Sequence, residues 1–193
     1  MRKTKNDIDR RRRRRRRRIQ VIVIYTAIAV GLAWFFESQA TTTVIFVRHA
    51  EKATAPADDP GLSEAGQRRA AELARQLVDA DVVAGIDAVY STPFRRTEET
   101  ARAVAEALDL SLVSYDAEDT ESFIEELVRK HKGKIVLVVG HSNTVPLMIA
   151  GMGASKKVPP IAEDEYDNIY LVSIPWFGKT KTIRLRYGEP YIP

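Results

Sequence analysis

The sequence predicts an α/β domain with a mainly parallel central sheet, preceded by one transmembrane helix. From Thr43 to Pro193, short apolar runs alternate with stretches whose apolar residues recur at helical spacing. Most of these runs are continuous and do not alternate with polar residues, as expected of strands that are buried on both faces of a sheet. Before them stands an uncharged segment, residues 19–36, which is long enough to span a bilayer as a helix.

This apolar segment follows a strongly basic tail, residues 1–18. The tail holds 12 Lys and Arg residues against two Asp residues and carries +10, whereas the whole chain carries +4 and the rest of it therefore −6. Arginines on the amino side of a span are retained in the cytoplasm, which directs the following domain across the membrane. The sequence therefore predicts a single-pass protein of the inner (plasma) membrane, with its domain on the extracytoplasmic (periplasmic) side.

Residues 19–36 have two interpretations, an uncleaved signal anchor and the apolar region of a cleaved signal peptide. Ser38 and Ala40 place small residues at the two positions that a signal peptidase inspects, so cleavage near Ala40 would release the domain. The apolar run is longer than a typical signal-peptide core, which favours the anchor. In both cases we expect residues 37–42 to form a linker and residues 43–193 to form the domain.

Charge and composition argue against several classes of partner and cofactor. Anionic headgroups account for a basic run beside an apolar segment, and the acidic domain offers no general surface for nucleic acid. The expected macromolecular contact is therefore the membrane, through residues 19–36. The absence of cysteine excludes disulfides, thiolate metal sites and thiol catalysis. The three histidines lack carboxylates at ligand spacing, so we expect no metal site.

The first two units of the domain each pair a short strand with an amphipathic helix. Residues 44–47 form the first strand, and after a Pro- and Asp-rich loop Ser63 caps a helix that runs to about residue 79. Residues 86–90 form the second strand. Pro93 suits the first turn of the next helix, which extends to residue 109 with its apolar residues at i, i+3, i+4 and i+7.

The next unit begins with residues 110–115, which are expected to form a short edge strand. A third amphipathic helix follows at residues 123–132, and Gly133 ends it. Its last turn is rich in Lys and Arg, so we expect His131 to be a solvated cation there rather than a ligand.

The last part of the domain contains three strands. Residues 134–139 are the strongest apolar run in the chain, and Pro146 is expected to start a helix that continues to about residue 152. Residues 168–174 and 180–187 form two further strands joined by a turn. Apolar and polar residues alternate in the second of them, as in an edge strand with one wet face. Residues 176–177, a Trp and a Phe, are expected to pack on the sheet, and an exposed lip is the alternative.

Polar side chains stand at the ends of three of the predicted strands. Arg48 and His49 follow the first strand, Arg96 follows the second, and His141 follows the strand at residues 134–139. If these strands are neighbours, two guanidiniums and two imidazoles converge on one pocket, to which helix amino termini add N–H groups. Such a pocket suits a dianionic phosphoryl group, which the guanidiniums bind and stabilise and which His49 can attack.

Four fragments carry a resemblance to a known family. They are Val47-Arg48-His49-Ala50-Glu51, Leu62-Ser63-Glu64-Ala65-Gly66, Ser91-Thr92-Pro93-Phe94-Arg95-Arg96-Thr97 with Thr100-Ala101, and Val139-Gly140-His141-Ser142. In this order and at these separations they resemble the histidine phosphatase superfamily, the phosphoglycerate-mutase-like fold. The resemblance extends over Thr43 to Ile174 and implies a three-layer domain.

The resemblance also implies roles for individual residues. His49 resembles the nucleophile that becomes phosphorylated, and Arg48 resembles its phosphate-binding neighbour. Arg96, rather than Arg95, is similar to the second phosphate-binding arginine because it lies four residues before Thr100. His141 resembles the second pocket histidine, which donates to the phosphoryl oxygens. Hydrolysis through phosphohistidine would then need neither a metal nor an organic cofactor.

Two further positions belong to the predicted site. The region that supplies a general acid in many members of the family contains Asp116, Glu118, Asp119 and Glu121, and Asp116 is the preferred candidate because it is nearest the strand end. The alternative is that all four carboxylates form a solvated helix start. Asn143 is expected to line the pocket and bind substrate, or to cap a helix.

The expected function is therefore a phosphatase that hydrolyses a phosphomonoester or a phosphoprotein through a covalent phosphohistidine. A phosphoglycerate-type mutase is the alternative within the fold, disfavoured because the chain lacks obvious insertions to retain a bisphosphorylated intermediate. A catalytically silent interaction module tethered to the membrane is the alternative from another class. The complete set of Arg48, His49, Arg96 and His141 argues against it.

Overall fold

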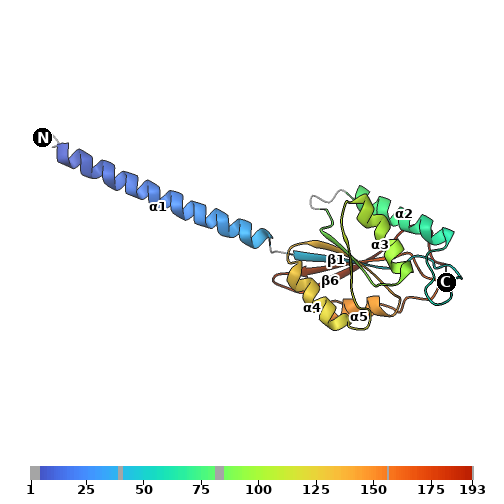
Figure 1. Ribbon diagram of the computed structural model, residues 1–193. Coiled ribbons are helices and arrows are strands. Elements are labelled where there is room, and N and C mark those ends of the chain that lie inside the picture. Colours follow the sequence, from blue (N-terminus) through green and yellow to red (C-terminus); the bar gives the residue numbers. More distant parts are fainter. Residues whose placement is uncertain (1–4, 39–40, 81–84, 156, 193) are drawn as a thin grey trace. The chain divides into compact units, whose positions relative to one another are not determined.

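The computed structural model describes residues 5–38, 41–80, 85–155 and 157–192, and the chain divides into two units, residues 1–39 and 40–193 (Figure 1). Gln39 and Ala40, at the possible cleavage site, lie outside the described residues. The first unit is a single helix, α1 (Lys5–Ser38). Its segment Arg12–Phe36 is long and apolar enough to cross a membrane. Length and composition alone support this assignment.

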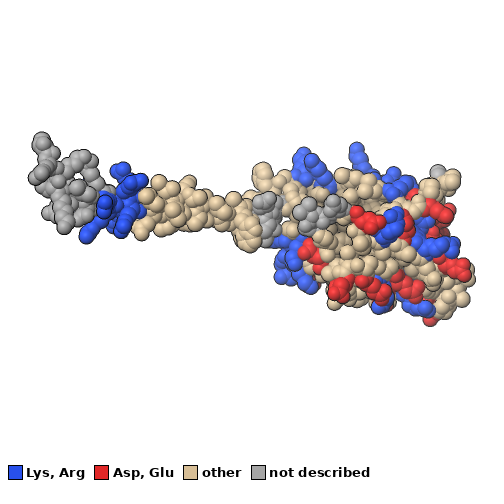
Figure 2. Space-filling view, turned by 90° about the horizontal axis from the view of Figure 1, so that it is seen from above, with Lys and Arg blue, Asp and Glu red and all other residues tan. Residues whose placement is uncertain are grey.

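Helix α1 contains both the basic run and the apolar run of the sequence. Along it, a band of basic side chains is followed by an uncharged length (Figure 2). Apolar side chains such as Ile22, Ile24 and Val30 are exposed on all sides of the helix. A helix that is apolar all round has the surface expected of a membrane span or a signal sequence.

The second unit is built on one six-stranded sheet with the strand order β3-β2-β4-β1-β5-β6. The strands are β1 (Thr41–Arg48), β2 (Ala88–Ser91), β3 (Leu112–Ser114), β4 (Ile135–Gly140), β5 (Asn168–Pro175) and β6 (Lys181–Arg186). Strands β1 to β4 are parallel, and β5 and β6 are joined to them in antiparallel pairs. The prediction of a mainly parallel sheet is confirmed, and β1 and β4, whose ends carry His49 and His141, are direct neighbours.

Four helices cover the two faces of the sheet: α2 (Glu64–Asp79), α3 (Arg95–Ala107), α4 (Thr120–Lys130) and α5 (Thr144–Gly151). Helices α2 and α3 lie on one side and α4 and α5 on the other (Figure 1). Because side chains alternate along a strand, Val44 and Phe46 of β1 pack with α4 and α5, whereas Ile45 and Val47 pack with α2 and α3. This arrangement is the predicted three-layer α/β domain.

The structure corrects two predicted helix starts. Helix α3 begins at Arg95, two residues after Pro93, and α5 begins at Thr144, two residues before Pro146. Ser63 caps α2 as predicted, with its hydroxyl accepting from the Gly66 N–H at 3.1 Å. Proline fixes the backbone of the first turn but does not fix which of its neighbours begins the helix.

Three predictions about burial are wrong. Strand β6 is an edge strand, but its apolar residues Ile183 and Leu185 are 58% and 49% exposed, because the helices pack mainly on β1 to β4. Trp176 and Phe177 do not pack on the sheet, since they are 70% and 90% exposed. His131 is not solvated: it is buried, and its Nε2 forms a hydrogen bond with the Tyr90 hydroxyl at 2.9 Å.

Gly66 provides a test of how tightly α2 packs behind the first strand. A Cβ at this position would clash with the backbone carbonyl oxygen of Glu51, so either the helix or the segment after His49 must move. We expect Gly66→Ala to lower the free energy of unfolding by about 1–3 kcal/mol, measured by thermal or chemical denaturation. Gly85→Ala is the matched control because its added methyl meets no atom within 4 Å. Equal stability of the two variants would contradict the prediction.

Candidate active site

A cavity of about 710 Å³ lies at the carboxyl ends of β1, β2 and β4. The structure brings all six predicted site residues into its wall: Arg48, His49, Arg96, Asp116, His141 and Asn143. Lys52, Phe94, Glu118 and Glu163 also line it. The sheet order explains the convergence, because parallel strands that are neighbours end at the same edge.

His49 is held in one orientation and one tautomer. Its side chain is almost completely buried, and its backbone N–H donates to the Gly140 carbonyl at 2.9 Å. The ring Nδ1 lies 2.8 Å from the Ala50 carbonyl oxygen, which can only accept, so Nδ1 carries the proton. Nε2 is therefore left with a lone pair. Burial, with the nearby charges of Arg48 and Arg96, lowers the pKa of His49 to about 3, which keeps the ring neutral.

Arg48 is clamped by a segment that is distant in the sequence. Its Nη1 donates to the carbonyl oxygens of Ala162, at 2.6 Å, and Glu165, at 3.1 Å. The guanidinium also lies over the Tyr166 ring, 4.1 Å from its centroid. Its Nε is buried and has no hydrogen-bond partner among the described residues. A buried cationic donor without a partner is suited to receive an anion.

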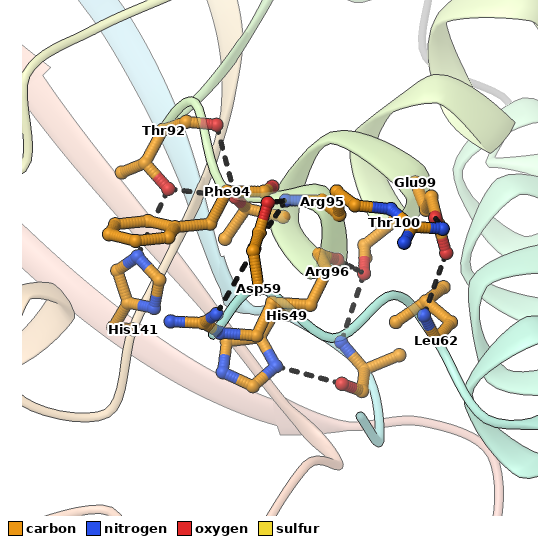
Figure 3. A network of polar contacts seen from close by, with 12 residues as sticks. His49, Asp59, Leu62, Thr92, Phe94, Arg95, Arg96, Glu99, Thr100 and His141 are labelled. Atoms are coloured by element: carbon orange, nitrogen blue, oxygen red, sulfur yellow. Dashed lines mark hydrogen bonds and ion pairs between the residues drawn. The ribbon is translucent and has the colours of Figure 1, made fainter. Parts of the chain in front are cut away.

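Arg95 and Arg96 point in different directions (Figure 3). Arg96 lines the cavity, lies over the Phe94 ring at 4.6 Å and pairs with Asp59 at 3.7 Å. Arg95 is largely exposed and pairs with Glu99, on α3, at 3.4 Å. The geometry thus agrees with the sequence register that selects Arg96 for the pocket.

Asp59 is a residue of the site that the sequence reasoning missed. It accepts from the Arg95 backbone N–H at 3.1 Å in addition to pairing with Arg96, so it ties the loop at residues 53–62 to the start of α3 (Figure 3). The sequence shows only an acidic residue in a Pro- and Asp-rich loop, and nothing in that loop points to the distant Arg95 and Arg96. Its carboxylate balances the charge of Arg96.

A chain of hydroxyl groups holds His141. Its Nε2 lies 3.0 Å from the Thr92 hydroxyl, which lies 2.7 Å from the Thr97 hydroxyl. Thr97 in turn lies within hydrogen-bond distance, 2.7 Å, of the Phe94 carbonyl oxygen. Burial, together with the charges of Arg96 and Arg48, lowers the pKa of His141 to about 4. Thr92 and Thr97 stand in the motif quoted above, but the sequence did not assign them a role.

The structure separates the four acidic candidates. Asp116 and Glu118 line the cavity, and the Asp116 carboxylate accepts from the Glu118 backbone N–H at 2.8 Å. Asp119 instead caps α4 by accepting from the Ser122 N–H, and Glu121 lies in the first turn of that helix. Two of the four carboxylates therefore face the site, and the helix-start interpretation fits the other two.

Asn143 lines the cavity together with the charged residues. Asn143 occupies the N-cap position of α5 without a side-chain capping bond, so its amide remains in the cavity wall. Among the residues that the structure describes, no group of three His, Asp or Glu side chains is arranged to hold a metal ion. The donors at this site are guanidinium, imidazole and amide groups, which suit an oxyanion.

The lowered histidine pKa values predict how stability depends on pH. His49 and His141 have folded-state pKa values of about 3 and about 4, below the ordinary 6.5. Between about pH 3 and pH 6.5 the unfolded chain binds more protons than the folded chain. The free energy of unfolding therefore falls as the pH falls from about 6.5 toward 3, and these two histidines do not make it depend on pH above about 6.5. His49→Asn and His141→Asn should flatten the dependence of unfolding free energy on pH. An unchanged slope would contradict the prediction.

Part of the chain is similar to known protein sequences. Residues 44–119 match the sequence model of the histidine phosphatase superfamily (branch 1). Phosphoserine phosphatase 1 of Hydrogenobacter thermophilus is 38% identical to the chain over 79 residues. The matched segment covers 38% of this chain and 36% of that enzyme, so it spans about a third of the relative's length.

Comparison with solved structures extends the likeness over the whole domain. The protein histidine phosphatase SixA, complexed with tungstate, superposes with a TM-score of 0.60 at 23% identity, over 75% of this chain and 96% of that one. A mycobacterial glucosyl-3-phosphoglycerate phosphatase gives 0.57 at 13% identity, over 76% and 98%. Phosphoglycerate mutase of Plasmodium falciparum gives 0.54 at 17% identity, over 80% and 95%. At these identities the likeness concerns the fold.

Proposed function

We propose that the chain is a member of the histidine phosphatase superfamily, whose sequence model its residues 44–119 match, and that it hydrolyses a phosphomonoester or a phosphoprotein through a covalent phosphohistidine at His49. One observation carries the proposal: the neutral His49 ring presents an unprotonated Nε2 in a cavity that is also lined by Arg48 and Arg96. A nucleophile beside two guanidiniums is the arrangement that phosphoryl transfer needs.

The first step is attack of the His49 Nε2 on phosphorus. The N–P bond forms as the bond from phosphorus to the leaving oxygen breaks, and a carboxyl group at Asp116 donates a proton to that oxygen. Arg48 and Arg96 bind the equatorial oxygens and stabilise the charge that develops on them. His141 and Asn143 supply further hydrogen bonds to the same group, and His141 gains a proton more readily once a dianion enters the cavity.

The second step is hydrolysis of the phosphohistidine. Water attacks phosphorus, the N–P bond breaks, and the Asp116 carboxylate accepts the proton that water loses. Inorganic phosphate then leaves and His49 returns to its neutral form. The chemistry uses only side chains of this chain and needs no metal or organic cofactor.

The experiment that tests the function is hydrolysis by the full chain in detergent micelles or lipid nanodiscs. The substrates are p-nitrophenyl phosphate, phosphoserine and a histidine-phosphorylated protein, with release of inorganic phosphate as the measurement. We expect turnover of at least one substrate in a buffer that contains a metal chelator. A folded protein that is inactive on all three would favour the silent interaction module instead.

Asp116→Asn tests the proton donor through the leaving group. Protonation matters most for a poor leaving group, so we expect kcat for phosphoserine to fall about 10²- to 10⁴-fold. The p-nitrophenolate ion leaves without help, so its kcat should change far less. Glu118→Gln is the matched comparison, because Glu118 is the other cavity carboxylate of this segment. An equal loss on both substrates for Asp116→Asn would contradict its assignment as the acid.

We further propose that α1 anchors the domain on the extracytoplasmic side of the inner (plasma) membrane. The supporting observations are its apolar length and the arginines on its amino side. A reporter that is active only outside the cytoplasm, fused after Pro193, should be active in cells. Activity of a cytoplasmic reporter at the same position would overturn the topology. The mass of the membrane-extracted protein distinguishes the anchor from a signal peptide cleaved near Ala40.

A further inference from the structure

The amino end of β1 is flanked by two turns of the domain. Thr41 pairs with Pro175, which places the β5–β6 turn beside it. Thr43 pairs with Ile135, and the Thr43 N–H donates to the Lys134 carbonyl at 2.9 Å, which places the α4–β4 turn on its other side. This end of the sheet is opposite the cavity, because the cavity lies where β1 ends.

The β5–β6 turn carries two exposed aromatic side chains. Trp176 is 70% exposed and Phe177 is 90% exposed, while Gly178 has the positive φ, 122°, that the turn requires. A large aromatic side chain costs free energy when it is held in water, so two in succession at a turn indicate a surface that is covered in use.

Basic side chains lie at the same end of the sheet as these aromatics. Exposed lysines lie in both turns or beside them: Lys132, Lys134, Lys179 and Lys181. Lys134 pairs with Asp87 at 4.0 Å, a long distance for an ion pair. Lys and Arg side chains are visible at the end of the domain where β1 begins, whereas most of the visible Asp and Glu side chains lie farther along (Figure 2). We call Trp176, Phe177 and these four lysines the basal surface.

The basal surface is covalently close to the apolar helix. Three residue steps lead from Ser38, the last residue of α1, to Thr41, the first of β1, and they span at most about 11 Å. If α1 crosses a bilayer, the start of β1 is held near the lipid headgroups. Tryptophan and lysine are the residues that favour this interface: the aromatic ring enters the headgroup boundary, and the ammonium group pairs with anionic lipid.

We propose that the basal surface rests on the bilayer, with Trp176 and Phe177 inserted at the boundary between headgroups and hydrocarbon and the lysines on anionic headgroups. This inference rests on the proposed anchoring of the chain by α1. The occupant is a lipid surface rather than another protein, because the tether already holds this end of the domain at the membrane and the charge of the surface complements anionic lipid.

Docking of this surface has a consequence for the substrate. Strand β1 runs from the basal surface to the cavity, and its eight residues, at about 3.3 Å each, cover about 25 Å. The docked domain therefore holds His49 and Arg48 well above the headgroups and facing away from them. The substrates that reach the cavity are then water-soluble phosphate esters or phosphoproteins, and the phosphates of the lipid headgroups are out of reach.

Labels at two introduced cysteines test the docking. The chain has no native cysteine, so Phe177→Cys and Ile192→Cys each create one site for an environment-sensitive fluorophore. Ile192 is the matched control: it is apolar and 83% exposed, and the adjacent Tyr191 N–H donates to Asp167, just before β5, at the cavity end of the sheet. The full chain is reconstituted in vesicles of phosphatidylethanolamine and phosphatidylglycerol.

The expected result is a blue-shifted emission of the label at position 177, strong quenching by brominated acyl chains and several-fold weaker quenching by aqueous iodide than at position 192. Vesicles that float with labelled protein whose two positions are equally accessible to iodide would overturn the docking alone. Failure of the chain to float with the vesicles would overturn the anchoring and the docking together. The result of the phosphatase assay depends on neither of them. Protection at 177 that disappears at high lipid-to-protein ratio would overturn the docking in favour of contact between copies.

Discussion

Replacement of His49 by alanine is expected to abolish hydrolysis of every substrate while the domain remains folded. In the proposed mechanism the His49 Nε2 forms the bond to phosphorus, and His141, its ring 5.4 Å away, is held through its own Nε2 by Thr92. We therefore expect kcat to fall on the order of 10³-fold or more. The measurement is release of p-nitrophenol under saturating substrate, together with a thermal melt that shows the variant is folded.

A trapping experiment makes this prediction independent of the substrate. Wild-type protein quenched during turnover of a ³²P-labelled substrate should carry an acid-labile label, as expected of a phosphorus–nitrogen bond, and His49→Ala should carry none. The matched control is His131→Asn, which removes a buried histidine that does not line the cavity and should retain activity if it folds. An active His49→Ala variant would refute the covalent mechanism.

Arg96→Ala is expected to have the second largest effect. It removes a guanidinium that lines the cavity beside His49, so binding of the phosphoryl group and stabilisation of its transition state are both lost. We expect kcat/KM to fall about 10²-fold or more, with an increase in KM and a decrease in kcat. The measurement is steady-state kinetics over a substrate range wide enough to define both constants.

Arg95→Ala is the matched control for this prediction. The two arginines are adjacent in the chain and lie in the same turn of α3, but the Arg95 side chain is exposed and pairs with Glu99. Its removal should change kcat/KM less than about twofold, as is usual for a surface side chain. If Arg95→Ala were the damaging variant, the arginine that binds phosphate would have been misassigned.

The acidic partner of Arg96, Asp59, lies in the loop at residues 53–62. Asp59 pairs with Arg96, so a phosphoryl group that enters the cavity would compete with it for the same guanidinium. The pair is partly exposed, which limits its strength. The loop that carries Asp59 thus contacts the site directly, and we propose that its residues contribute to the choice of leaving group.

The sequence alone determined the strand ends that carry the chemistry. His49 and His141 stand at the ends of continuous apolar runs, which are recognisable because burial on both faces requires them, and Arg96 lies in the helix turn that follows a shorter strand. The order and spacing of the motifs then selected Arg96 over Arg95, and the cavity contains Arg96. Each of these features depends on a local pattern of neighbouring residues, which can be recognised in the sequence without the fold.

Only the tertiary structure decided what holds these groups in place. Arg48 is clamped by the carbonyl oxygens of Ala162 and Glu165, more than 110 residues away, and backbone carbonyls leave no mark in a sequence. Pairing of Asp59 with Arg96 likewise depends on the path of an irregular loop. The exposure of Trp176 and Phe177 and the burial of His131 also followed from packing, because local composition says which surfaces are apolar or charged but not which ones the fold covers.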